Sequence, residues 1–132
     1  KVKVEYRSIS FLDRASTTNY STRALNSVGC VADKDPAAFA KYHDLLFQNQ
    51  PAEGGPGLPD SKLLSMAGEA GVTGIDSCVK DQKFKGWTQR VTDQSSKDGV
   101  NGTPTVIVNG NNVDQPWVGD NTKKAIEAAL AG

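Results

Sequence analysis

The sequence predicts an α/β fold in which a long helical section separates a first strand from a C-terminal pair of strands. Three observations predict it. Residues 1–7 alternate polar and apolar side chains, and apolar residues in the middle of the chain recur every three or four positions. Residues 105–108 form a β-branched run that ends in an Asn-Gly turn. The predicted order is strand, several helices, two strands and a closing helix.

The first strand is predicted over Lys1–Arg7. Val2, Val4 and Tyr6 alternate with charged residues, so they would lie on one face of a strand and could be buried there together. This period of two is typical of a strand with one buried face.

Two helices are predicted next. Apolar side chains spaced by three and four residues predict a helix over residues 16–31, and Gly29 weakens its end. Asp35 and Pro36 are typical of an N-cap followed by a first-turn proline. A second helix therefore begins there and continues to about residue 50.

More helix is predicted between a glycine- and proline-rich surface loop and the second strand. The loop covers residues 53–57. A helix capped by Asp60 ends at Gly71, a short helix follows, and a longer one continues toward Gly99.

The C-terminal part is predicted to contain a hairpin and a helix. Thr105–Val108 is the second strand, and Asn109–Asn112 is the hairpin turn. Val113 begins a short third strand, and an amphipathic helix runs from Asn121 to Leu130.

Pro104 stands at the start of the second strand. Proline has no N–H to donate to a sheet, so it is tolerated at the first residue of a strand but not inside it. Only about 5–6% of bonds that precede proline are cis in folded proteins, so the residues alone favour a trans bond.

Composition indicates one soluble globular domain. The chain has 132 residues, of which 37% are hydrophobic, and 15 basic residues balance 15 acidic ones. No net field attracts nucleic acid or an anionic membrane, so nucleic acid is not an expected partner. No apolar run approaches the roughly 20 residues that span a bilayer. Because the sequence begins at Lys1 and goes straight into a strand pattern, we expect further sequence upstream.

The two cysteines, Cys30 and Cys78, lie 48 positions apart on predicted helices and form no Cys-X-X-Cys motif. Reduced buried thiols and a structural bridge both remain open from their spacing, and neither cysteine is expected to be catalytic. His43, the single histidine, is expected to be a partly buried structural residue, and Trp117 a packing residue. No metal site and no cofactor are predicted.

Four stretches carry a resemblance to a known family, and together they cover nearly the whole chain. They are the strand Val2–Leu12 that runs into "YRSISFL", the helix "FAKYHDLLF" (Phe39–Phe47), the stretch Leu63–Val79 from "LLSMAGEAGV" to "CV", and "GVNGTPTVIVNG" (Gly99–Gly110). With these stretches the chain resembles the DsbA-like thioredoxin-fold proteins of actinobacterial type, which are extracytoplasmic thiol-disulfide oxidoreductases.

The resemblance implies a thioredoxin-like, DsbA-type sheet with a helical insertion domain. Residues 1–13 and 100–132 would be the thioredoxin-fold elements, and residues 14–99 the helical insertion, within one DsbA-like domain portion. It implies a structural disulfide between Cys30 and Cys78 and a cis Thr103–Pro104 bond. It also implies a substrate-binding loop made of Gly102, Thr103, Pro104 and Thr105.

One departure from the family is important. The family carries its Cys-X-X-Cys at the start of a helix that follows an earlier strand, where the helix dipole lowers the pKa of the attacking thiol. This sequence contains no such motif, so no catalytic residue is expected within the chain, and the chain should be inactive alone. We expect the first strand and the active-site helix to lie in a missing N-terminal segment.

The resemblance also implies partners and a location. The substrates would be extended or unfolded polypeptides, and a membrane protein is a candidate redox partner. The protein would be periplasmic, cell-wall or secreted, and the missing segment is a candidate membrane anchor.

Two other functions stay open. One is a non-catalytic thioredoxin-like module that binds peptides or a partner protein. The other is a kappa-type glutathione-dependent enzyme or an isomerase, which shares the helical insertion and the cis proline.

Overall fold

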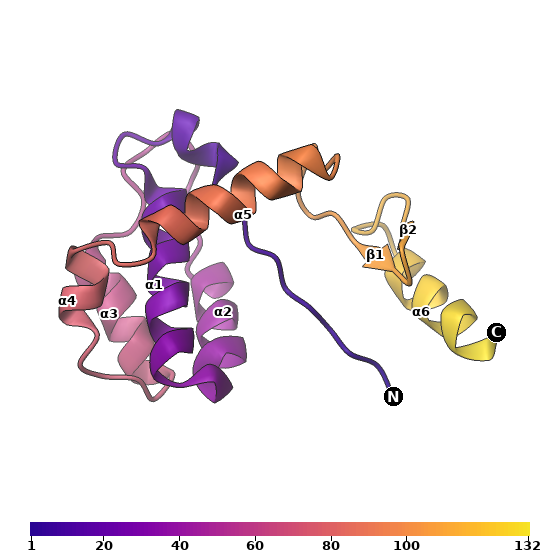
Figure 1. Cartoon of the computed structure of the whole chain (residues 1–132), viewed down its shortest axis with the longest axis horizontal. Coiled ribbons are helices and arrows are strands. Elements are labelled where there is room, and N and C mark those ends of the chain that lie inside the picture. Colours follow the sequence, from indigo (N-terminus) through magenta and orange to yellow (C-terminus); the bar gives the residue numbers. More distant parts are fainter. The chain divides into compact units, whose positions relative to one another are not determined.

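The structure is a computed structural model that describes residues 1–132. It divides into two compact units, Lys1–Ser95 and Ser96–Gly132. The first unit is helical, and both strands belong to the second (Figure 1). With 3-10 helices written η, the elements in chain order are η1 (Phe11–Ala15), α1 (Tyr20–Lys34), η2 (Pro36–Ala38), α2 (Phe39–Gln48), α3 (Asp60–Glu69), α4 (Asp76–Lys80), α5 (Lys85–Lys97), β1 (Ile107–Val108), β2 (Asn111–Asn112) and α6 (Asn121–Ala131).

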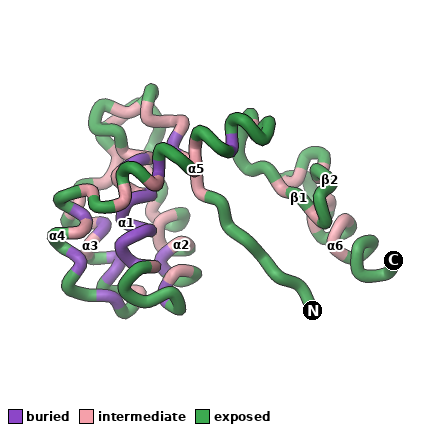
Figure 2. The backbone as a smooth tube through the Cα atoms, in the orientation of Figure 1, coloured by how far each residue is buried: buried purple, intermediate pink, exposed green.

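The hydrophobic core lies in the first unit. Buried positions concentrate on α1 and α3 and on the segment around α4 (Figure 2), and α2 adds Tyr42, whereas residues 96–132 include no buried side chain. Burying a Val, Leu or Ile side chain contributes about 1.5–3 kcal/mol, so the first unit holds most of the stabilising apolar burial. The core residues are Leu25, Val28, Cys30, Val31, Ala38, Tyr42, Leu63, Met66, Ala67, Val72, Ile75 and Val79.

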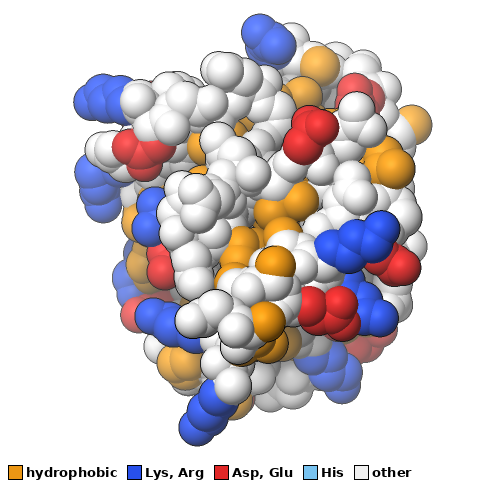
Figure 3. All heavy atoms as spheres, turned by 90° about the vertical axis from the view of Figure 1, so that its right-hand side faces the viewer, with side chains coloured by type: hydrophobic (Ala, Val, Ile, Leu, Met, Phe, Trp, Pro, Cys, Tyr) orange, Lys and Arg blue, Asp and Glu red, His pale blue; other side chains and the backbone are white.

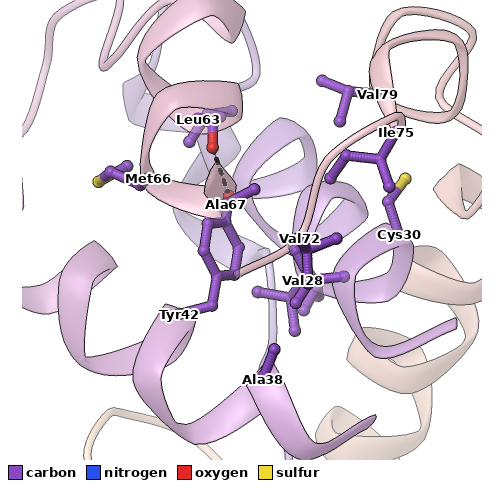
Figure 4. Close-up of a cluster of buried hydrophobic side chains, with 12 residues drawn as sticks. Val28, Cys30, Ala38, Tyr42, Leu63, Met66, Ala67, Val72, Ile75 and Val79 are labelled. Atoms are coloured by element: carbon purple, nitrogen blue, oxygen red, sulfur yellow. Dashed lines mark hydrogen bonds between the residues drawn. The ribbon is translucent and has the colours of Figure 1, made fainter. Parts of the chain in front are cut away.

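Tyr42 joins three helices at the centre of this core (Figure 4). Its side chain is fully buried, and its hydroxyl lies 2.7 Å from Ser27 Oγ on α1 and 3.3 Å from Leu63 O on α3. The Ser27 hydroxyl donates in turn to Ala24 O at 2.6 Å, so it accepts from Tyr42. Burial raises the pKa of Tyr42 to about 12, still further above neutral pH than that of a free phenol, so the hydroxyl is protonated and can donate.

Helix α1 begins four residues later than the sequence predicts, because side chains before it bind its first N–H groups. Ser16 Oγ accepts from Tyr20 N at 3.0 Å, and Asp13 Oδ1 accepts from Thr22 N at 3.0 Å. These bonds satisfy donors that have no partner inside the helix.

One face of α1 makes three different contacts with the segment that contains α4 and the start of α5. Asn26, Gly29 and Cys30 share this face, because residues three and four apart lie one above the other on a helix. Asn26 binds the main chain of that segment, Gly29 lies against the Phe84 ring, and Cys30 is bonded to Cys78. Gly29 therefore lies within the helix and does not weaken its end.

Replacing Gly29 by alanine is expected to lower the free energy of unfolding by about 1 kcal/mol net. A Cβ at this position would lie 2.8 Å from Phe84 Cγ, so the ring would have to move. Overpacking of this kind costs about 1–3 kcal/mol and outweighs the gain of up to about 1 kcal/mol in helix propensity. Urea denaturation followed by far-ultraviolet circular dichroism measures the change.

Gly68→Ala is the matched control for this prediction. Gly68 is exposed in α3, and no atom lies within 4 Å of the Cβ that alanine would add. This substitution should raise stability by about 0.5–1 kcal/mol. Equal stabilisation by both substitutions would show that the Phe84 contact does not matter.

Residues 1–10 form no strand, so the strand predicted over Lys1–Arg7 is wrong for this structure. The sheet consists of β1 and β2 alone, and a strand exists only where its N–H and C=O groups pair with a neighbour. Val2, Val4 and Tyr6, which the prediction buries on one face, are 52%, 64% and 55% exposed.

The N-terminal segment is attached to α5 through Ser10. Ser10 N donates to Thr92 Oγ1 at 3.0 Å, and the two hydroxyl oxygens are also 3.0 Å apart. Thr92 Oγ1 donates in turn to Thr88 O at 2.8 Å. This contact joins residues that are 82 positions apart in the sequence.

Candidate functional site

A β-hairpin follows the candidate substrate loop. Strand β1 pairs antiparallel with β2, and Ile107 lies opposite Asn112. Asn109 and Gly110 form the turn with φ of 48° and 85°, the left-handed values that a tight hairpin turn of the primed type requires. Each strand is only two residues long, shorter than the sequence predicts for the first of them, and the bond from Val113 N to Val106 O at 2.9 Å extends the pairing.

The loop Gly102–Thr105 ends two residues before β1. All four residues are exposed, and the Thr103–Pro104 peptide bond is cis. Thr105 Oγ1 donates to Gly102 O at 2.7 Å, which closes the loop on itself. The main chain of Thr103 is therefore presented to solvent by a loop with an internal brace.

A second exposed loop of the same unit presents Trp117. The sequence predicts that Trp117 is a packing residue, but its side chain is 66% exposed. Its loop is fixed to the start of α6, because Asn121 Nδ2 donates to Asp114 O at 3.2 Å and Thr122 Oγ1 donates to Pro116 O at 3.0 Å. An exposed tryptophan on a braced loop is a binding candidate that the sequence pattern missed, since a Pro-Trp pair occurs in packed turns as well.

An open groove of about 630 Å³ lies between the hairpin and α6. Asparagines and alanines line most of it, and none of Gly102–Thr105 contributes to it. The groove is thus separate from the predicted substrate loop.

Cys30 and Cys78 form a disulfide bond, with their Cα atoms 6.0 Å apart. Cys30 is 1% exposed on α1, and Cys78 lies on α4. The chain has no free thiol. The bond belongs to the first unit, whereas the loop Gly102–Thr105 belongs to the second.

His43 lies in a row of aromatic rings on α2. Its ring centroid is 4.7 Å from that of Tyr6 and 4.8 Å from that of Phe47, and Phe39 is 5.7 Å away on the other side. His43 Nδ1 is 3.4 Å from Asp44 Oδ1. The imidazole is thus packed among apolar rings, as expected of a structural histidine.

No three His, Cys, Asp or Glu side chains lie together as a metal site would require. Acidic and basic side chains are interspersed on the face drawn in Figure 3. None of the helices combines the length and the apolar character needed to cross a bilayer.

Comparison with protein families gives a match over almost the whole chain. Residues 1–128 match the thioredoxin family described as Thioredoxin_4.

Solved structures of DsbA and DsbG are similar to this chain. The chain is similar to oxidized DsbA of Mycobacterium tuberculosis, with 33% identity, a TM-score of 0.69 and coverage of 96% of this chain and 69% of that one. It is also similar to the reduced disulfide bond oxidoreductase DsbG of the same organism, with 33% identity, a TM-score of 0.70 and coverage of 96% and 68%.

A curated relative carries a different name. The serine/threonine-protein kinase PknE of Mycobacterium tuberculosis is 33% identical over 117 residues, which are 80% of this chain. The match spans 20% of the kinase, so this chain is similar to about a fifth of that protein.

Proposed function

Since the chain belongs to the DsbA-like thioredoxin-fold family, with a thioredoxin match over residues 1–128 and 33% identity to solved DsbA and DsbG structures, we propose that it is part of a protein thiol-disulfide oxidoreductase. In this enzyme the chain supplies the substrate-binding loop Gly102–Thr105 and a helical cap made of α1 to α5.

The observation that carries this proposal is the exposed and braced loop Gly102–Thr105 directly before the hairpin. An extended polypeptide can pair with the exposed main chain of Thr103 in the manner of an added strand, which needs no particular substrate sequence. The loop is therefore suited to extended or unfolded polypeptides, which are the substrates we propose.

The redox-active cysteines in this proposal come from a part of the protein outside residues 1–132. Cys30 and Cys78 are already bonded to each other, and Cys30 is buried in the core, so this pair serves as a structural bridge. Buried thiols are poor candidates for exchange because the apolar surroundings disfavour the thiolate. A stable bridge also fits a protein outside the cytoplasm, with a membrane protein as the proposed redox partner.

A second candidate function is a binding module without redox activity. The similarity to a fifth of a serine/threonine kinase favours it, because a domain of this kind can stand within a larger protein of another activity. In that case the loop Gly102–Thr105 would hold a peptide or partner protein with no exchange step.

The test uses the full-length natural protein and the brace between Thr105 and Gly102. Thr105→Val keeps the shape of the side chain but removes the hydroxyl, whereas Thr105→Ser keeps the hydroxyl. Two measurements follow each variant: reduction of insulin, and binding of a fluorescent unfolded peptide by anisotropy. One hydrogen bond is worth about 0.5–1.5 kcal/mol, so Thr105→Val should weaken peptide binding and raise KM roughly 2- to 10-fold.

The serine variant should behave like the wild type in both assays. Equal binding by the valine variant and the wild type would contradict the role of this loop. Peptide binding without insulin reduction in any form of the full-length protein would exclude the oxidoreductase and support the binding module.

A further inference from the structure

The segment before the candidate substrate loop contains an exposed Asn101–Gly102 pair. Both residues are exposed and lie outside regular structure. No atom lies within 4 Å of the position that a Cβ on Gly102 would take. The carbonyl of Gly102 accepts from Thr105 Oγ1, but its N–H is bound to no acceptor in the chain. The Gly102 nitrogen therefore has no hydrogen-bond partner that holds it away from the Asn101 side chain.

We propose that Asn101 is a site of spontaneous deamidation. The Gly102 nitrogen loses its proton and attacks Cγ of Asn101, which forms a five-membered succinimide ring and releases the side-chain nitrogen as ammonia. Water then adds to either ring carbonyl and opens the ring to aspartate or isoaspartate. The net change consumes one water and releases one ammonia, and no oxidant is needed. Glycine favours the attack because it has no side chain to obstruct its nitrogen.

The same dipeptide occurs at Asn109–Gly110, where the structure disfavours the reaction. This pair forms the turn between β1 and β2, with φ of 48° and 85° fixed by the paired strands on both sides. To bring the Gly110 nitrogen against the Asn109 side chain, the main chain must leave this turn and break the hairpin bonds. Asn101 should therefore react first in the folded protein.

Deamidation at Asn101 would alter the loop that follows. Aspartate adds a negative charge two residues before Thr103, and isoaspartate also adds a methylene to the main chain. If the loop binds polypeptides, as the proposed function requires, the modified protein should bind them more weakly. This consequence rests on the proposed function, whereas the chemical reaction does not.

The experiment incubates the full-length natural protein at mildly alkaline pH and follows deamidation by peptide mapping with mass spectrometry. The Asn101 peptide should convert several-fold faster than the Asn109 peptide. In protein unfolded with urea, the two peptides should convert at similar rates. Gly102→Ala is the matched variant, because the space around Gly102 accepts a Cβ, and it should slow conversion at Asn101 alone.

Two results would overturn the proposal: conversion at Asn109 as fast as at Asn101 in the folded protein, or no conversion at Asn101 while the unfolded protein reacts. A separate measurement compares peptide binding by the Asn101→Asp variant and the wild type. Deamidation at Asn101 with unchanged peptide binding would leave this proposal standing and would count against the proposed role of the loop.

Discussion

Removal of the Cys30–Cys78 bond is expected to lower the free energy of unfolding by about 4 kcal/mol. The bond closes a loop of 48 residues. In the chain-entropy account, a loop of this length lowers the entropy of the unfolded chain by an amount equivalent to about 4 kcal/mol. A small domain is stable by only about 5–15 kcal/mol, so this loss is a large part of the total. The double substitution Cys30→Ala with Cys78→Ala, measured by urea denaturation of the protein, tests it.

The reducing agent provides the control for this prediction. Dithiothreitol should shift the urea midpoint of the wild type toward that of the double variant, but it should leave the double variant unchanged. A double variant as stable as the oxidized wild type would contradict the prediction. It would mean that the unfolded chain is already compact in this region, so that the bond restricts little.

Replacing Asn26 by leucine is expected to cost about 2–4 kcal/mol. Asn26 is fully buried, and its Oδ1 accepts from Phe84 N at 2.8 Å. Its Nδ2 lies 3.3 Å from Val79 O and 3.4 Å from Cys78 O. The two carbonyls that it binds also accept from backbone N–H groups, but Phe84 N would lose its partner. A buried donor without an acceptor costs about 1–3 kcal/mol, and the lost hydrogen bonds of the Asn26 side-chain amide add to this. Urea denaturation measures the sum.

Asn26→Asp tests the same site through the pH dependence of stability. The new carboxyl would keep the bond from Phe84 N but face two carbonyl oxygens, so burial and these oxygens would raise its pKa. A raised pKa in the folded state means that stability is present at low pH and is lost as the pH rises through that pKa. The deficit of Asn26→Asp relative to the wild type should therefore be larger at neutral pH than in acid.

Asn49→Ala is the control for the Asn26 substitutions, because it removes a side-chain amide that is less buried than that of Asn26. Asn49 donates one bond, from Nδ2 to Leu45 O at 2.9 Å, at the end of α2. Its loss should cost about 1 kcal/mol or less. Equal effects at Asn26 and Asn49 would show that the contacts of Asn26 with the α4–α5 segment add nothing.

The helical part of the fold is largely predictable from the sequence, because a repeat of apolar residues every three or four positions is a local signal. The details that fail depend on contacts that the repeat of apolar residues does not encode. Gly29 has low helix propensity, and only the contact with Phe84, which is 55 positions further along, explains why a glycine stands inside α1. The start of α1 depends on the side chains of Asp13 and Ser16, which bind its first N–H groups.

The strands are less predictable, because pairing is not a property of one segment. Lys1–Arg7 has the alternation of a strand, but the structure provides no neighbour for it, and the pattern cannot encode the partner. The Asn109–Gly110 turn, by contrast, is a local signal, and the hairpin is found at this pair. Its turn is shorter than the predicted Asn109–Asn112, because Asn111 and Asn112 form β2, which therefore begins before Val113.

The candidate site was predictable only in part. The loop Gly102–Thr105 followed from the family resemblance and its place before a strand, but its exposure and internal hydrogen bond required the structure. The cysteines permitted one pairing, yet their spacing did not show whether folding brings them together. Trp117 was missed because exposure depends on what surrounds a side chain in space.

The bond between Ser10 and Thr92 has a consequence for how the helical unit can be carried by a longer chain. Ser10, which stands just before η1, and Thr92, which lies in the second half of α5, are joined by contacts of 3.0 Å, although 82 positions separate them. A host protein could therefore carry the helices between Ser10 and Thr92 as an insertion within one of its loops. Because these two residues lie side by side, no long linker would be needed to join the insertion to the host. Adjacent ends of this kind are what makes the insertion of one domain into another tolerable.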